Sequence, residues 1–307
     1  MRRIEANIVM QPDHHRDSPA PGAKLKVREI RESDLDAVAR LLNRGFDFRS
    51  VDYWLRGLER HAKRPRPANY PAFGYCLDSG GKPVGVILLL FSEVRAGDET
   101  IVRCNVSSWY AEPAFRAFAP LMVKAAIKDK NVTYFNITPA PHTWSTVEAQ
   151  GFSLYCKGQV YGALMLSPPA RGAKVELFSA DDAAGLTDYE ADLLRQHDGF
   201  GCLSLVVRDG TDAYPFVFQK HFVNGFVPVH RLLYCREIDD VRRFAGNVGR
   251  FLARRGGLFV RFDANGPVSG IVGWYSEKRG RKYAKGPHWP RLGDLAFTEA
   301  ALFDGEA

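Results

Sequence analysis

The sequence lacks most of the short motifs that mark common enzyme and binding classes. Its 307 residues contain no HExxH zinc motif, GxSxG nucleophile turn, Walker phosphate loop, CxxC pair or EF-hand loop. The eight histidines are scattered along the chain. These absences argue against a zinc protease, a hydrolase of the nucleophile-elbow type and a P-loop nucleotidase, and we predict no metal site.

Cysteine is scarce, and its number is odd. No two cysteines have the spacing of a metal or redox pair, so we interpret them as free, buried thiols in a reducing compartment. This interpretation favours a cytoplasmic protein. Each of the five lies in an apolar, strand-like run: Cys76, Cys104, Cys156, Cys202 and Cys235.

Long hydrophobic runs are also missing. The longest, residues 83–91, has the length of a strand and falls well short of the roughly 18 apolar residues of a membrane-spanning helix. No apolar segment follows Met1-Arg2-Arg3, so we expect neither a signal peptide nor a membrane partner. Residues 1–23 are rich in proline and polar residues, which predicts a flexible tail.

The first half of the chain alternates between strand-like and helix-like patterns. The predicted order is β-α-α-β-β-β-α-β-α-β-β, and its central β-α-β unit predicts two parallel strands among antiparallel ones. We therefore expect an α/β (α+β) fold with a mixed sheet over residues 24–167, followed by a linker at 167–172. The expected strands are 25–30, 72–77, 84–91, 101–109, 132–137, 152–155 and 159–166, and the expected helices start at 35 and span 51–61, 115–128 and 142–150.

Residues 173–307 repeat part of this order. After a helix at 186–196, three strands, a periodic helix and a further strand follow as in the core of the first half. We interpret this as a diverged internal duplication that gives two tandem domains of one fold. The elements of the repeat are strands 202–207, 214–222 and 227–235, the helix 239–254 and the strand 258–262.

The segment 105–121 carries the most chemical information. A strand ends near Trp109, a turn contains Pro113, and a helix begins near Arg116. The first amides of a helix have no internal partners and carry the positive end of its dipole, so they suit a pyrophosphate. The small side chains of Ala117 and Ala119 would let phosphates approach the backbone. The basic excess of the chain, net charge +7, agrees with an anionic ligand.

This segment resembles the GNAT (GCN5-related N-acetyltransferase) superfamily. Residues 111–117 (AEPAFRA) resemble the family's V-x-P-x-Y-R-G strand end, and residues 116–121 (RAFAPL) resemble its (Q/R)-x-x-G-x-(G/A) loop. The sequence Gly151-Phe152 resembles the end of the next motif. Four positions depart from the pattern. Ala119 replaces a glycine, Pro120 has no N–H, and Leu121 replaces a small residue. Val147 stands where the family often has a tyrosine that acts as the general acid.

The resemblance implies two tandem GNAT-like domains and an N-acyltransferase. Its co-substrate would be acetyl-CoA or another acyl-CoA, and its acceptor an amine of a small molecule or peptide. A backbone N–H near Tyr110 or Ala111 would polarise the thioester carbonyl, with Glu112 as candidate base and Tyr155 as candidate acid. The residues expected to bind the cofactor are Tyr110, Ala111, Arg116, Ala117, Phe118, Ala119 and Leu121.

Plainer interpretations stay open for several of these residues. Glu112 suits a solvated first-turn acid, Tyr155 a packed strand aromatic, and His142, a further candidate base, a capping residue. The basic and aromatic run 275–289 suits a solvated edge or a nucleic-acid contact. The second copy has no phosphate loop before its helix 239–254, and Asp239 and Asp240 at the start of that helix would repel a pyrophosphate, so we expect no CoA there.

Two other functions stay open for the whole chain. One is a catalytically silent protein that binds CoA or another anion on the same scaffold. The other resembles the tandem GNAT-like transferases that use aminoacyl-tRNA as donor; apart from that tRNA we expect no nucleic-acid partner.

Overall fold

The computed structural model describes residues 24–96, 99–223 and 227–303. The predicted tail, residues 1–23, lies outside them. The chain forms two compact units. We call residues up to 153 together with 282–289 the N-terminal unit, and residues 154–281 together with those from 290 onward the C-terminal unit. No helix in the described ranges is both long and apolar enough to cross a membrane.

The N-terminal unit is built on a seven-stranded mixed sheet. Its strands pair antiparallel from β1 to β4, whereas β4 and β5 are parallel. This confirms the mixed sheet that the sequence predicts. In spatial order the strands are β1 (Leu25–Glu29), β2 (Gly74–Ser79), β3 (Lys82–Ala96), β4 (Glu99–Ala111), β5 (Thr133–Asn136), β14 (Lys282–Lys285) and β6 (Ser153–Cys156).

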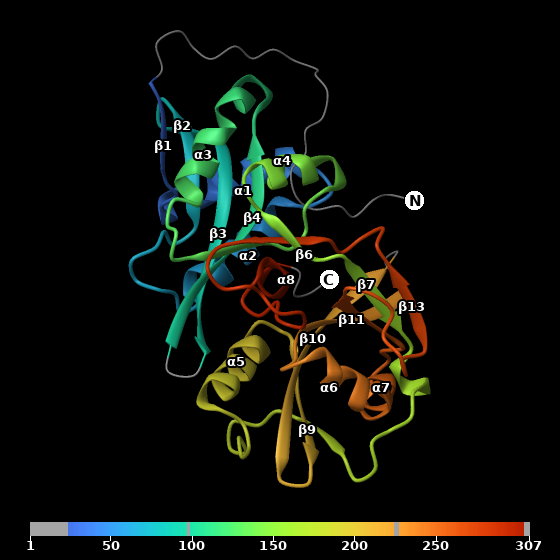
Figure 1. The fold of residues 1–307 in the computed structure, drawn as a ribbon. Helices are drawn as coiled ribbons and strands as arrows, with labels where there is room; N and C mark the ends of the chain where they lie inside the picture. The colour runs from blue at the N-terminus through green and yellow to red at the C-terminus, as the bar shows by residue number, and fades with distance from the viewer. Residues whose placement is uncertain (1–23, 97–98, 224–226, 304–307) are drawn as a thin grey trace. The chain divides into compact units, whose positions relative to one another are not determined.

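Helices cover both faces of this sheet (Figure 1). A Cβ atom on Gly45 of α1 would lie 2.4 Å from the ring of Tyr110, and one on Gly85 of β3 would lie 2.9 Å from Met122 of α3. Tyr110 pairs with Val86, the residue next to Gly85. Because neighbouring strand residues point to opposite faces, Tyr110 and Gly85 face opposite sides of the sheet, and so α1 and α3 cover opposite faces. The helices are α1 (Leu35–Gly45), α2 (Val51–Lys63), α3 (Ala119–Ala126) and α4 (Trp144–Ala149), and short 3₁₀ turns are η1 (Glu32–Asp34), η2 (Pro113–Phe118) and η3 (Pro141–Thr143).

The C-terminal unit holds a second seven-stranded sheet. In spatial order its strands are β13 (Gly273–Ser276), β7 (Gly158–Gly162), β12 (Phe259–Ala264), β11 (Val227–Tyr234), β10 (Asp212–Val223), β9 (Leu203–Asp209) and β8 (Lys174–Leu177). The remaining elements are η4 (Leu164–Leu166), α5 (Asp188–Gly199), α6 (Ile238–Arg243), α7 (Ala245–Ala253) and α8 (Glu299–Leu302).

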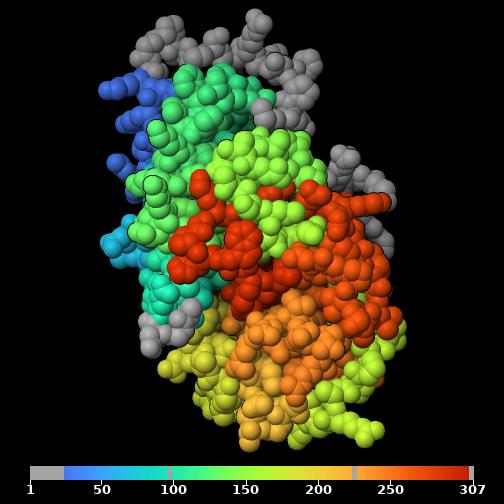
Figure 2. All heavy atoms as spheres, viewed as in Figure 1, coloured from blue at the N-terminus to red at the C-terminus, as the bar shows by residue number. Residues whose placement is uncertain are grey.

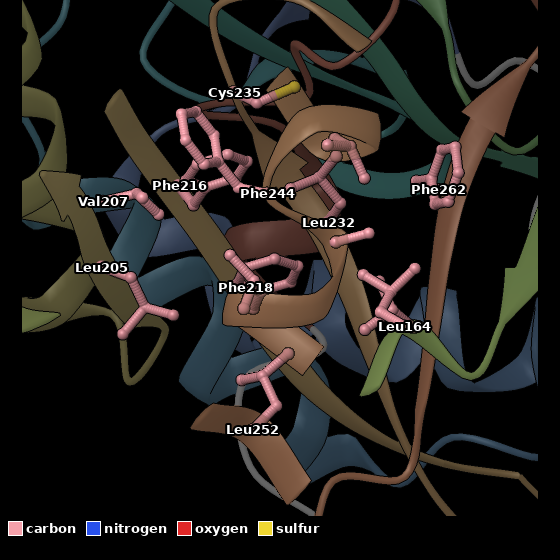
Figure 3. Packing of buried hydrophobic residues seen from close by; sticks show 14 of the residues in the cluster. Leu164, Leu205, Val207, Phe216, Phe218, Leu232, Cys235, Phe244, Leu252 and Phe262 are labelled. Atoms are coloured by element: carbon pink, nitrogen blue, oxygen red, sulfur yellow. The ribbon is translucent and has the colours of Figure 1, made fainter. Parts of the chain in front are cut away.

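One face of this second sheet packs against α6 and α7. Figure 3 shows Phe218 and Leu232 of the sheet facing Phe244 and Leu252 of the helices. All four side chains are almost fully buried. Removing such apolar surface from water, at roughly 25 cal/mol per Å², is the main stabilising contribution to this core.

The two sheets have the same plan, but each contains a strand from the other half of the chain. Strand β7 follows β6 along the chain, yet it pairs with β12 and β13 of the second sheet. In Figure 1 β7 is the green strand beside the orange β13. Strand β14 pairs with β5 and occupies the matching position in the first sheet.

This exchange differs from the sequence-based expectation, which placed the strand at 159–166 in the first half. Alternating side chains predict a strand, but not the sheet edge on which it pairs. The basic run also differs from the expected solvated edge, because Lys282 and Tyr283 belong to β14 and are fully buried.

Candidate active site

Strands β4 and β5 separate partway along the N-terminal sheet. Their parallel pairing ends at Asn105 and Phe135. Immediately afterwards β4 carries a bulge, in which Ser107 and Ser108 together oppose Leu88 of β3. A bulge bends the strand that contains it, so β4 turns away from β5. The side-chain amide of Asn105 donates to the carbonyl of Phe135 at the point of divergence, 3.2 Å away.

A narrow cavity lies beside the separated strands. Its free volume is about 20 Å³, room for about one water molecule, so a larger ligand would have to displace the side chains that line it. Its polar groups come from Ser107, Asn136 and Gln150, and the rest of the wall is apolar. The lining residues are Ile87, Val106, Ser107 and Trp109 from β3 and β4, Val123 and Ile127 from the α3 region, and Asn136, Val147, Gln150 and Phe152 from β5 onward.

Two backbone amides of β4 point toward the open edge. The amide of Glu112 donates to Val84 on β3, and antiparallel neighbours alternate between bonded and non-bonded pairs. Tyr110, paired with Val86, therefore directs its N–H toward β3. Ala111 and Trp109 direct theirs away from β3, toward the space that β5 leaves. Of the two predicted donors, Ala111 is thus the one that faces the separation.

A basic groove adjoins the cavity. Both hollows are lined by Val123, Ile127 and Gln150, so they meet along one side of α3. The outer surfaces of α3 and α4 are open to solvent on the face seen in Figure 2. Lys285 of β14 donates to the backbone oxygen of Gln150 at 2.7 Å. The groove is lined by Pro120, Val123, Lys124, Ile127, Lys128, Gln150 and Lys285.

The predicted phosphate loop is wound into a 3₁₀ turn. The amide of Phe115 donates to Glu112, and that of Ala119 donates to Arg116. Pro120 has no amide hydrogen. Phe118 and Leu121 are exposed at the start of α3. The loop therefore offers fewer amides to a ligand than the sequence pattern predicts.

The candidate base and the neighbouring tyrosine face α1. Glu112 accepts from Arg44 at 2.7 Å, and the ring of Tyr110 lies against Gly45. Burial and the charge of Glu112 raise the pKa of Tyr110 above its usual value, so this phenol keeps its proton. Neither side chain lines the cavity.

Other sequence candidates lie elsewhere. Tyr155 is buried in β6 and does not line the cavity, and its role as an acid stays a prediction. His142 is exposed in η3. The five cysteines are buried free thiols, and burial raises the pKa of Cys76 to about 11. A thiol with so high a pKa makes a poor nucleophile at neutral pH.

The corresponding site of the C-terminal unit is filled by its own chain. Strands β11 and β12 also pair in parallel only briefly, ending at Arg231 and Arg261. Beyond that point Leu295 donates to Leu233 at 2.7 Å and Cys235 donates to Gly293 at 2.9 Å. The backbone of residues 293–295 thus pairs with the edge of β11 from which β12 has diverged.

Comparison with known proteins identifies the fold. No protein-family model and no curated protein matches the sequence. Solved structures do match over most of the chain. A GCN5-related N-acetyltransferase from Kribbella flavida superposes with a TM-score of 0.51 at 14% identity, covering 85% of this chain and 71% of its own. The chain has the GNAT fold.

Two further structures extend the likeness. A putative acetyltransferase from Pyrococcus horikoshii matches with a TM-score of 0.53 at 11% identity over 93% of this chain and 97% of its own. The GCN5-related glucosamine N-acetyltransferase region of a fungal multi-domain GH3 β-N-acetylglucosaminidase matches with a TM-score of 0.53 at 11% identity, over 86% of this chain. Our chain spans 38% of that protein's length.

Within the GNAT fold, sequence reasoning missed several residues of the candidate site. Ser107 and Gln150 line the cavity, and Lys285 lines the groove. The serine pair follows Arg103 and Asn105 in the same strand, so the sequence does not single it out. No local signal reveals Lys285, because it comes from β14, some 135 residues from Gln150 along the chain.

Proposed function

We propose that the chain is an acyl-CoA-dependent N-acyltransferase of the GNAT type. It would transfer an acyl group from acetyl-CoA, or another acyl-CoA, directly to an amine of a small molecule or peptide. One observation carries this proposal: β4 and β5 of the N-terminal unit separate beside a small cavity, whereas residues 293–295 pair with the corresponding strand edge in the C-terminal unit. One donor site per chain follows.

The geometry supports a short list of chemical roles. The pantetheine arm would enter the cavity, and the thioester oxygen would accept a hydrogen bond from the N–H of Ala111. The amine attacks the carbonyl carbon, the C–S bond breaks, and the thiolate takes up a proton. Glu112 stays the candidate base, acting through water because Arg44 holds its carboxylate. Tyr155 stays the candidate acid.

The donor's diphosphate would lie beside the start of α3. Tyr110 and Ala111 precede this point in the chain, and Pro120 belongs both to the predicted loop and to the basic groove. The other residues proposed to contact the cofactor are Arg116, Ala117, Phe118, Ala119 and Leu121.

The first experiment is calorimetric titration with acetyl-CoA and CoA. The wild type is expected to bind acetyl-CoA with a dissociation constant on the order of micromolar. Val147→Phe, which adds a ring to the cavity wall, should abolish binding. Thr146→Phe is the matched control, because this neighbour on α4 is exposed and does not line the cavity. Absence of binding by the folded wild type would refute the acyl-CoA mechanism and favour the tRNA-dependent alternative.

One observation favours the alternative of ligand binding without turnover. None of the ten residues lining the cavity carries a carboxylate, imidazole, thiol or phenol. Val147 stands at the expected tyrosine position. Thiol release in the presence of a panel of amines separates the two functions: an enzyme releases CoA in proportion to acceptor, whereas a silent scaffold binds acetyl-CoA and releases none.

A further inference from the structure

We propose that Lys124, Lys128 and Lys285 hold the phosphate groups of the acyl donor in place of the backbone amides of the 116–121 loop. This inference rests on the proposed function, and it identifies how the charged end of the donor is bound. It also assigns a role to β14, because that strand supplies one of the three lysines.

The loop itself cannot supply a full set of amide donors. The N–H groups of Phe115 and Ala119 are already hydrogen-bonded to Glu112 and Arg116, and Pro120 has none. A diphosphate at this position needs donors from another source. Side-chain ammonium groups are the alternative that general chemistry offers.

The groove provides such groups on a single surface. Lys124 lies on α3 and Lys128 two residues beyond its end; both line the groove, and both are exposed. None of the seven lining residues is acidic, so the positive charge is not neutralised within the groove. An exposed cluster of three like charges is unfavourable by itself and is relieved when an anion binds.

Lys285 is held in place more firmly than the other two lysines. Its ammonium group donates to the oxygen of Gln150, at the C-terminal end of α4, and its stem is partly buried. An ammonium group has three N–H donors, so one bond to Gln150 leaves two for a ligand. A fixed cation of this kind binds a phosphate at lower entropic cost than a mobile surface lysine.

The position of the groove fits a two-part ligand. The groove and the cavity share Val123, Ile127 and Gln150. A molecule whose apolar arm reaches into the cavity, displacing its lining side chains, therefore carries its other end along the groove that the lysines line. Acyl-CoA has this construction, with an uncharged pantetheine arm joined to a diphosphate and a nucleotide 3′-phosphate.

The test measures acetyl-CoA affinity by calorimetry at low and high salt for matched variants of the full chain. The triple variant Lys124→Gln, Lys128→Gln, Lys285→Gln should weaken binding on the order of 100-fold and lose most of the salt dependence. Lys63→Gln, the same substitution at one exposed lysine of α2, should have no effect, and each single lysine variant of the groove is compared with it. Lys285→Arg should retain affinity within a few-fold, because it keeps the charge.

The outcomes separate this inference from the proposed function. If the triple variant binds acetyl-CoA as tightly as Lys63→Gln does, while Val147→Phe still blocks binding, the lysine site is refuted and the donor cavity stands. If the wild type binds no acetyl-CoA, both fail. If Lys285→Gln does not fold, the double variant at Lys124 and Lys128 still decides, with an expected loss of about tenfold or more.

Discussion

At the scale of single residues, strand pairing selects Ala111 as the proposed oxyanion donor. Its N–H faces the separation between β4 and β5, so a proline at this position removes the donor without removing a bond to β3. Ala111→Pro should reduce the rate of acyl transfer by about 10²-fold and change acetyl-CoA affinity only a few-fold. The measurement is single-turnover thiol release beside calorimetry. An unchanged rate would exclude this amide as the oxyanion donor.

His230 gives a pH dependence of stability at the same scale. Burial, followed by the charge of Lys220, lowers the pKa of His230 to about 4, against about 6.5 in an unfolded chain. Between these values the unfolded state binds more protons. The free energy of unfolding should therefore fall as the pH is lowered from 6.5 to 4, by up to about 1.4 kcal/mol per pH unit.

Urea unfolding at several pH values checks this effect. His230→Phe should flatten the pH slope over that range, whereas His142→Phe, at an exposed position, should leave it unchanged. A wild-type slope equal to that of His230→Phe would show that the imidazole titrates normally in the folded protein.

Individual site residues were predictable only where local pattern and strand geometry agree. The end of β4 was placed within a few residues because apolar alternation and Pro113 mark it, whereas the predicted helix start at 115 falls inside η2. The partner of Glu112 was not predictable, because Arg44 lies 68 residues away in the chain. The face of β4 on which each side chain lies was not predictable either, because the bulge at Ser107 and Ser108 shifts the alternation of side chains along the strand.

At the scale of elements, we expect the bulge in β4 to control access to the proposed donor site. Deleting Ser108 leaves one residue opposite Leu88 and restores regular pairing with β3. Strand β4 should then run straight beside β5 and close the cavity, which should abolish acetyl-CoA binding with a small change in melting temperature. Ser108→Ala keeps the bulge and should bind normally. Retained binding by the deletion variant would show that the bulge does not open the site.

The sequence predicted most elements, but it did not predict their partners. Periodicity located β2 to β5 and β9 to β12 within a few residues, because one or both faces of these strands are buried. The predicted helix at 115–128 is divided into η2 and α3. Strands β13 and β14 were missed, because their basic and aromatic residues suggested an exposed surface. Burial of Lys282 depends on β5, which lies far away in the chain.

At the scale of the whole molecule, strand exchange should keep the two halves together after the chain is cut. A protease site inserted between Arg171 and Gly172, which are both exposed, leaves β7 in the first fragment and β14 in the second. Because each sheet then contains a strand of the other fragment, the fragments should co-elute on size exclusion and separate only in denaturant. Separation in native buffer would contradict the exchanged topology.

The exchanged strand β14 also sets the order in which the protein can mature. Most tandem proteins fold domain by domain as the chain leaves the ribosome. Here the first sheet lacks its sixth strand until residues 282–285 of 307 have been synthesised. The proposed donor site, with Lys285 at its edge, is therefore completed only after β14 has left the ribosome. Until then the proposed co-substrate should not bind, and chaperones would meet a first half with an open sheet edge.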